Sequence, residues 1–157
     1  QRRKIAEWLS KKTGIPLYDK KALTQIAEEN HLVPENSVSE EKKIQEMHRE
    51  AIKFLADKES CIFVGRCADV VLKDHENCYS FFIHSPLEER IKRIVETEHV
   101  TERQAKKMIK QTDWERSSYH NYYTKQKWGD PGNYDLMINS ARTGIQKAVE
   151  IIMDYVK

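Results

Sequence analysis

The sequence predicts an α/β protein in which helices cover both faces of a parallel sheet. Short apolar runs of strand length alternate with longer segments of helical periodicity. No hairpin turn separates two strand-like runs, so the strands are expected to pair in parallel through helical crossovers. The first clear strand stops at Gly65-Arg66, and the carboxyl edge of such a sheet is where ligands bind.

The composition fits a single domain over residues 1–157. Charged residues make up 33% of the chain and hydrophobic residues 39%, which allows a core together with long polar helical faces. The net charge of +2 argues against a nucleic-acid polymer as partner. No apolar run reaches membrane-spanning length and no signal peptide is visible, so we expect a cytoplasmic protein. The 3 cysteines lack metal-ligand spacing, which favours reduced, buried thiols.

The first part of the chain predicts three helices and one extended segment. A helix is expected over residues 5–12, and Pro16 favours an extended segment at 15–18. Asp19 has the place of an N-cap for the second helix, and Ser37 with Glu40 has capping-box spacing for the third. The third helix is expected to face the core with Ile44, Met47, Ala51, Ile52 and Leu55.

The middle of the chain predicts two strands and the helices that follow them. The strands are expected at residues 61–64 and 79–83, with a short helix at 67–72 between them. Ser85 and Glu88 have capping-box spacing around a first-turn proline. The buried face of the helix that begins there is expected to contain Leu87, Ile91, Ile94 and Val95.

The last part of the chain predicts two helices and a third strand. Thr101 with Gln104 begins a long helix that ends in an aromatic cluster at residues 119–123. A turn-rich segment at 128–133 leads into a strand at 134–139. The final helix has an apolar stripe of Ile145, Ala148, Val149, Ile152 and Val156.

Arginines at the ends of these elements are the main candidates for function. Arg66 follows a strand, Arg90 and Arg93 lie on the helix after the next strand, and Arg116 lies further on. Several guanidiniums with few catalytic bases fit phosphoryl transfer, which depends on positioning and on neutralising negative charge. The alternative for each arginine is a solvated or weakly ion-paired surface residue.

Asp113 and Arg116 are three residues apart, so they share one helix face with His120 a further turn along. In the functional interpretation Arg116 meets a phosphate while Asp113 orients it or bonds a base or sugar. The alternative is an intrahelical ion pair. The aromatic cluster that follows could stack on a base or pack a lid segment.

The remaining polar residues show no further pattern. His31, His48, His75, His84 and His99 are interpreted as structural or solvated. No metal-binding motif, catalytic acid pair or nucleophile elbow is present, so no metal ligand is predicted in the chain. A glycine-rich phosphate loop is also absent from these residues.

Ordered motifs along most of the chain resemble the cytidylate kinase-like family of P-loop nucleoside monophosphate kinases. The stretch from Cys61 to Asp69 is similar to that family's strand followed by Val-Gly-Arg-Cys-Ala-Asp. Other segments follow in the family's order. They are residues 5–9, 14–20, 82–94, 113–116, 122–123, 128–129 and 134–140.

This resemblance implies a three-layer α/β/α P-loop kinase fold with a helical lid. It implies ATP with Mg²⁺ as phosphoryl donor and CMP or dCMP as the first acceptor to consider. The family's phosphate loop would lie immediately before Gln1. Residues 30–58 would form the monophosphate-binding region, and residues 97–130 would form the lid.

The resemblance also implies roles for particular residues. Asp19 matches a position in the monophosphate-binding region, and Arg66 matches the strand-end arginine near the acceptor. Arg90 and Arg93 resemble lid-base arginines that approach the donor phosphates. Asp113 and Arg116 match the lid Asp-x-x-Arg that meets the acceptor nucleotide.

Three positions differ from typical cytidylate kinases. Lys20 and Gln25 replace a hydroxyl and an arginine that contact the nucleotide, and Cys67 replaces an aspartate after Gly-Arg, with Asp69 two residues on. Asp69 is therefore taken as the substrate-binding carboxylate of this segment. Two alternatives stay open: a P-loop kinase for another small-molecule acceptor, and a catalytically degenerate nucleotide-binding protein.

Overall fold

The computed structural model describes residues 1–35 and 39–157, which divide into two compact units. The amino-terminal unit comprises Arg2–Cys78 with Tyr155–Lys157, and the carboxyl-terminal unit comprises Tyr79–Asp154 with Gln1. Each unit contains one pair of parallel strands and its own helices. None of the described helices is long and apolar enough to cross a membrane.

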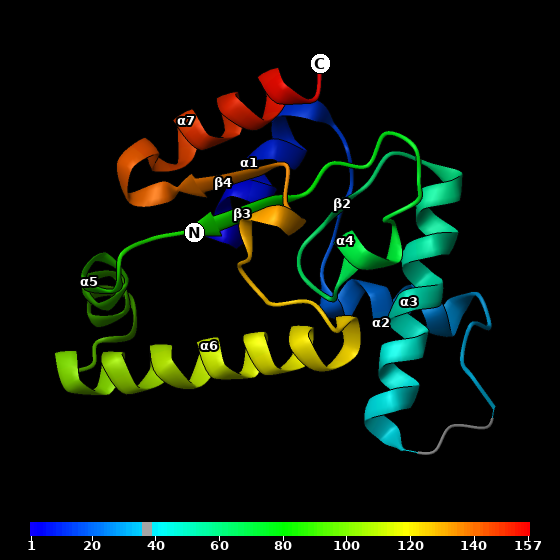
Figure 1. Cartoon of the computed structure of the whole chain (residues 1–157), viewed down its shortest axis with the longest axis horizontal. Coiled ribbons are helices and arrows are strands. Elements are labelled where there is room, and N and C mark those ends of the chain that lie inside the picture. The colour runs from blue at the N-terminus through cyan, green and yellow to red at the C-terminus, as the bar shows by residue number, and fades with distance from the viewer. Residues whose placement is uncertain (36–38) are drawn as a thin grey trace. The chain divides into compact units, whose positions relative to one another are not determined.

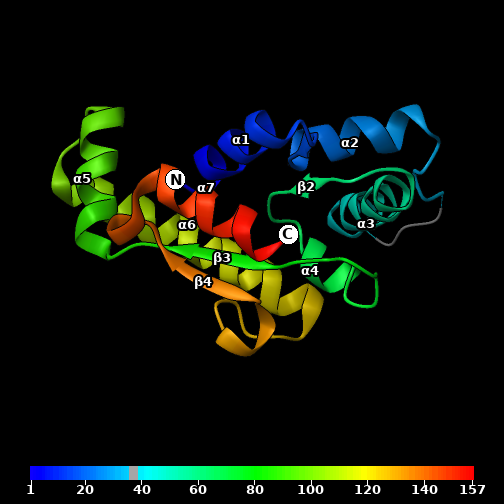
Figure 2. The ribbon, with the colours of Figure 1, turned by 90° about the horizontal axis from the view of Figure 1, so that it is seen from above.

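In the amino-terminal unit, two packed helices form most of the core. Leu23 and Ala27 of α2 meet Ala51, Ile52 and Leu55 of α3, and all five are buried. Figure 2 shows these two helices side by side. The elements are α1 (Arg2–Thr13), β1 (Leu17–Tyr18), α2 (Lys20–Glu29), α3 (Glu40–Lys58), β2 (Ile62–Phe63) and α4 (Ala68–Val71).

The carboxyl-terminal unit is built around a second parallel strand pair. Phe81 lies opposite Leu136 and His84 lies opposite Asn139, and both strands run the same way in Figure 1. The Ser140 hydroxyl donates to the carbonyl of His84 at 3.3 Å. The elements are β3 (Phe81–His84), α5 (Leu87–Glu98), α6 (Glu102–Thr124), a 3₁₀ turn (Pro131–Asn133), β4 (Leu136–Asn139) and α7 (Ser140–Tyr155), which is interrupted at Gly144.

The predicted α/β class and parallel pairing are confirmed, whereas the prediction of three strands in one sheet is wrong. The extended segment before Asp19 forms a strand, so the described residues contain two separate pairs, β1–β2 and β3–β4. Leu17–Tyr18 has only two residues, too few to show the alternation by which a strand is found.

Two of the predicted helix caps are confirmed. The Asp19 carboxylate accepts from the Ala22 N–H at 2.9 Å, and Thr101 with Gln104 forms both bonds of a capping box. Ser37 lies outside the described residues, and the side chain of Ser39 caps α3. The predicted box at Ser85 is wrong: Pro86 takes the N-cap position, so Ser85 lies one residue too early.

Several side chains predicted to face the core are exposed. Ile44 is 39% exposed, although the other four members of the α3 stripe are buried. Leu87 is 41% exposed, and α5 has no fully buried residue, since its apolar side chains are only half covered. Val156 is 38% exposed because it lies beyond the end of α7.

Candidate functional site

Charged residues gather where β1 and β2 end in the amino-terminal unit. The strands are parallel with Tyr18 opposite Phe63, so their carboxyl ends lie at one edge. Asp19 and Lys20 follow β1 directly, and Arg66 follows β2 after a short connection. Arg66 thus lies at the carboxyl end of a strand, as its sequence position predicts.

The turn that presents Arg66 is conformationally strained. Gly65, Arg66 and Cys67 have φ values of 70°, 56° and 59°, so three consecutive residues are in the left-handed region. This conformation costs a residue other than glycine about 1–2 kcal/mol. Such strain persists only where the surrounding structure enforces it, and it is concentrated at functional sites.

Three further cations lie close to the ends of β1 and β2. The guanidinium of Arg2 lies 3.8 Å from the position that a Cβ on Gly65 would occupy. Arg3 donates to the Asp19 carboxylate at 2.7 Å. We call Arg2, Arg3, Lys20 and Arg66 the basic cluster. Its four positive charges exceed those of the two carboxylates that pair with Arg3, Asp19 and Glu7, so it suits an anion such as a phosphate.

Asp19 has a structural role in this arrangement. The hydrogen bond from the Ala22 N–H lowers the pKa of Asp19, and the bond from Arg3 lowers it further. In return, the hydrogen bond to Asp19 raises the pKa of Arg3. The carboxylate thus caps α2 and holds one arginine of the basic cluster in place.

Asp69 lies half-buried in the first turn of α4, close to the buried thiol of Cys67. Burial and, to a smaller extent, the Asp69 carboxylate raise the pKa of Cys67 to about 11, against an opposing effect of Arg66. The pKa of Cys61 is also raised to about 11, chiefly by burial. Both thiols are therefore protonated at neutral pH and poor nucleophiles.

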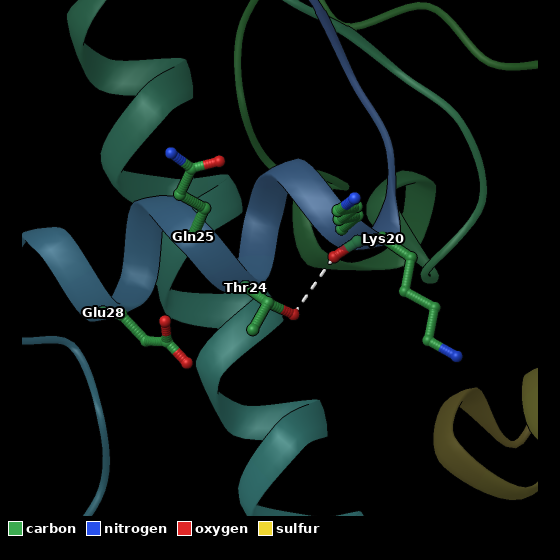
Figure 3. A pocket seen from close by; sticks show the side chains of 5 residues that line it. Lys20, Thr24, Gln25 and Glu28 are labelled. Carbon is green, nitrogen blue, oxygen red and sulfur yellow. Dashed lines mark hydrogen bonds between the residues drawn. The ribbon is translucent and has the colours of Figure 1, made fainter.

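An open hollow of about 490 Å³ runs along α2 beside Lys20 (Figure 3). Inside it, the Thr24 hydroxyl donates to the Lys20 carbonyl at 3.1 Å. Lys20 and Gln25, two of the three positions at which the sequence differs from the family pattern it resembles, line this hollow. Its lining residues, all polar or charged, are Lys20, Lys21, Thr24, Gln25 and Glu28.

In the carboxyl-terminal unit, Arg90 and Asp113 form a bidentate ion pair between α5 and α6. Its two hydrogen bonds measure 2.8 and 2.5 Å, and each side chain is about three-quarters buried, with 26% and 31% exposed. The alternative pairing of Asp113 with Arg116 does not form. Arg116 is exposed and has no hydrogen bond or ion pair within the described residues. Asp113 therefore holds an arginine of the preceding helix.

Arg93 differs from Arg90 although it lies on the same helix. Its side chain is half-buried and makes no hydrogen bond or ion pair with any described residue, while its carbonyl accepts from the Thr97 hydroxyl at 2.9 Å. Burial lowers the pKa of Arg93 and the neighbouring Arg90 cation lowers it further, while Glu89 partly offsets these effects. A partly desolvated cation beside another cation gains most from an anionic ligand.

His120, which the sequence places one turn beyond Asp113 and Arg116 on α6, is buried, with only 6% exposed. His120 follows the buried Ile109 by about three helical turns and so lies on the same inward face. The tyrosines contact one another, with ring centroids of Tyr119 and Tyr123 at 4.7 Å. Tyr122 is 65% exposed.

The sequence interpretation missed the contributions of α1, α2 and α3 to this site. Arg2 and Arg3 come from α1, and Thr24 is bonded to His48 of α3 at 2.8 Å. His48 could have been found, because it falls at helical spacing from the buried residues Ala51 and Ile52. Across the residues that the structure describes, no group of three or more His, Cys, Asp or Glu side chains could hold a metal ion.

A model of the cytidylate kinase-like family matches residues 1–142. The chain belongs to the cytidylate kinase-like family. A crystal structure of an uncharacterized protein from Eubacterium ventriosum ATCC 27560 is similar, with 33% sequence identity and a TM-score of 0.84 over 97% of this chain and 89% of that chain. No curated protein matches. Family membership supports a nucleotide kinase-like role and confirms the resemblance found in the sequence.

Proposed function

We propose that this member of the cytidylate kinase-like family transfers the γ-phosphoryl group of ATP to a nucleoside monophosphate. CMP or dCMP is the first acceptor to consider. The observation that supports the proposal best is Arg66, presented by a strained turn at the carboxyl edge of β1 and β2. With this function we propose a three-layer P-loop kinase fold with a helical lid over residues 97–130.

The basic cluster would bind the acceptor phosphate. The guanidinium of Arg66 can donate two parallel hydrogen bonds to phosphate oxygens, and Lys20 adds a point charge. Asp19 keeps Arg3 in place at 2.7 Å. The carboxylate of Asp69 would accept a hydrogen bond from the sugar or base.

Arg93 would bind the donor phosphates and Arg116 would meet the acceptor nucleotide, since neither side chain is hydrogen-bonded or ion-paired within the described residues. Arg90 uses two of its five N–H donors on Asp113, so it can still meet a phosphate oxygen. Asp113 likewise keeps lone pairs for a hydroxyl of the acceptor. The guanidinium groups of Arg90 and Arg93 fit the triphosphate of ATP. Mg²⁺ on those phosphates would neutralise further negative charge.

An acceptor panel tests the proposal. The full-length protein is incubated with MgATP and, separately, with CMP, dCMP, UMP, AMP, GMP or dTMP, and the products are identified by ³¹P NMR. We expect ADP and the matching nucleoside diphosphate in equal amounts, with CMP or dCMP best. Turnover of none of the six, or release of inorganic phosphate alone, would contradict the proposal.

A further inference from the structure

His48 is a buried titratable residue that none of the roles above explains. It lies on α3 and is 1% exposed, and its Nε2 is 2.8 Å from the Thr24 Oγ1 on α2. Its Nδ1 is buried and has no hydrogen-bond partner among the described residues. A buried polar nitrogen without a partner is costly, so its retention calls for a reason.

The hydrogen-bond chain from His48 defines the state of its ring. The Thr24 hydroxyl has one proton, which it donates to the Lys20 carbonyl. With that proton on the Lys20 carbonyl, we assign Thr24 as acceptor from His48, which puts the imidazole proton on Nε2 and a lone pair on Nδ1. The chain runs from α3 through Thr24 to Lys20, the first residue of α2.

Two cations of the basic cluster act on the same ring. Burial lowers the pKa of His48 most, and the positive charges of Arg66 and then Lys20 contribute to a pKa of about 4. Lys20 comes from α2 and Arg66 from the turn after β2, so the charged groups that influence the ring belong to both strand ends. Their positive potential also favours a lone pair on Nδ1 over a proton.

We propose that His48 is a positioning residue of the acceptor site: through Thr24 it fixes the first turn of α2, so that Lys20 and Arg66 face one phosphate group. The inference rests on the proposed function. An uncharged ring supports both cations without adding a third positive charge. When a phosphate binds, its negative charge offsets the two cations, and protonation of His48 becomes easier.

Kinetics of the full-length protein test the positioning role. His48→Leu and Thr24→Val each remove the hydrogen bond between His48 and Thr24. We expect either change to raise the KM for CMP about tenfold. The KM for ATP should stay within about twofold, because ATP binds other residues. His48→Gln keeps an N–H donor for Thr24 and should restore the KM for CMP. His75→Gln, at an exposed histidine on the same unit, is the matched control and should match wild type.

NMR titration of the His48 ring gives a readout that does not require turnover. Saturating CMP, or inorganic phosphate as a simpler probe, should raise the His48 pKa by roughly one unit. The ring signals of His75 are the control and should not respond to CMP or phosphate. A purely structural histidine would show no such response.

The outcomes separate this inference from the proposed function. If wild type phosphorylates CMP but His48→Leu and Thr24→Val leave its KM unchanged, the positioning role is wrong. The same holds if CMP leaves the His48 pKa unmoved. If His48→Leu does not fold, the KM of Thr24→Val for CMP and the NMR titration of wild-type His48 still test the positioning role. A wild-type protein that turns over no acceptor overturns the proposed function itself.

Discussion

Gly65 is the residue on which the orientation of Arg66 depends most. Its φ of +70° strains any other residue, although an added methyl would meet only Arg2, at 3.8 Å. Gly65→Ala should therefore lower the free energy of unfolding by about 1–2 kcal/mol. It should also lower kcat/KM at least tenfold, because the turn that presents Arg66 would relax. Denaturant unfolding and steady-state kinetics measure the two effects.

Gly14 provides the matched control. Its φ is +76° and nothing lies within 4 Å of an added Cβ, so the backbone strain is the same. Gly14→Ala should lose similar stability and keep its activity. Equal losses of activity in the two variants would show that the turn at Gly65 has no special role.

His48 predicts a pH dependence of stability. Its folded pKa of about 4 lies below the ordinary value of 6.5. Between these values the unfolded chain binds a proton that the folded protein does not, so stability falls as the pH falls from 6.5 to 4. The loss should approach about 3 kcal/mol at pH 4, with no loss from this group above pH 7. Urea unfolding from pH 4 to 7 should show this slope in wild type and a smaller one in His48→Gln. An unchanged slope in the variant would assign it to other groups.

The Arg90–Asp113 pair is the best-defined link between two elements, joining α5 to α6. A double-mutant cycle with Arg90→Lys and Asp113→Asn should give a coupling energy of about 1 kcal/mol, since the pair is bidentate but part-exposed. The effect on the KM for ATP should be larger than the loss of stability implies, because Asp113 orients a donor-side arginine. The control is a cycle on Lys147 and Glu150, an exposed pair at 3.8 Å. A coupling energy near zero would show that the Arg90–Asp113 pair does not stabilise the contact between α5 and α6.

Local chemistry made some elements predictable from sequence and hid others. Asp19 and Thr101 were found as caps because each side chain bonds a backbone N–H within three residues. The capping box predicted at Ser85 does not form, because the neighbouring Pro86 takes the N-cap position. The sequence spacing alone does not reveal this shift. The strand at Leu17–Tyr18 is defined by pairing with Ile62–Phe63, a contact distant in sequence.

The same distinction applies to the site. Arg66 could be placed after a strand from sequence because Gly65 ends the apolar run that precedes it. The different states of Arg90 and Arg93 could not, since they depend on Asp113 reaching back from α6. The contacts of His48 with Thr24 likewise join two helices, and only folding brings them together.

At the scale of the whole molecule, the family model extends over residues 1–142 and so includes most of both units. Each unit contains predicted site residues: Arg66 in one, and Arg93 and Arg116 in the other. The net charge is only +2, so positive charge is a local property of these groups rather than of the chain. Under the proposed function, Arg66→Ala and Arg93→Ala should each lower turnover.

The most direct test of the account is the kcat/KM for CMP of Arg66→Ala in the full-length protein. The control is Arg49→Ala, which removes an exposed arginine of α3. The account predicts a loss of about 10²–10³-fold for Arg66→Ala, typical of removing a donor that stabilises transition-state charge, and wild-type kinetics for Arg49→Ala. Equal kcat/KM values for the two variants would contradict the assignment of Arg66 to the acceptor phosphate.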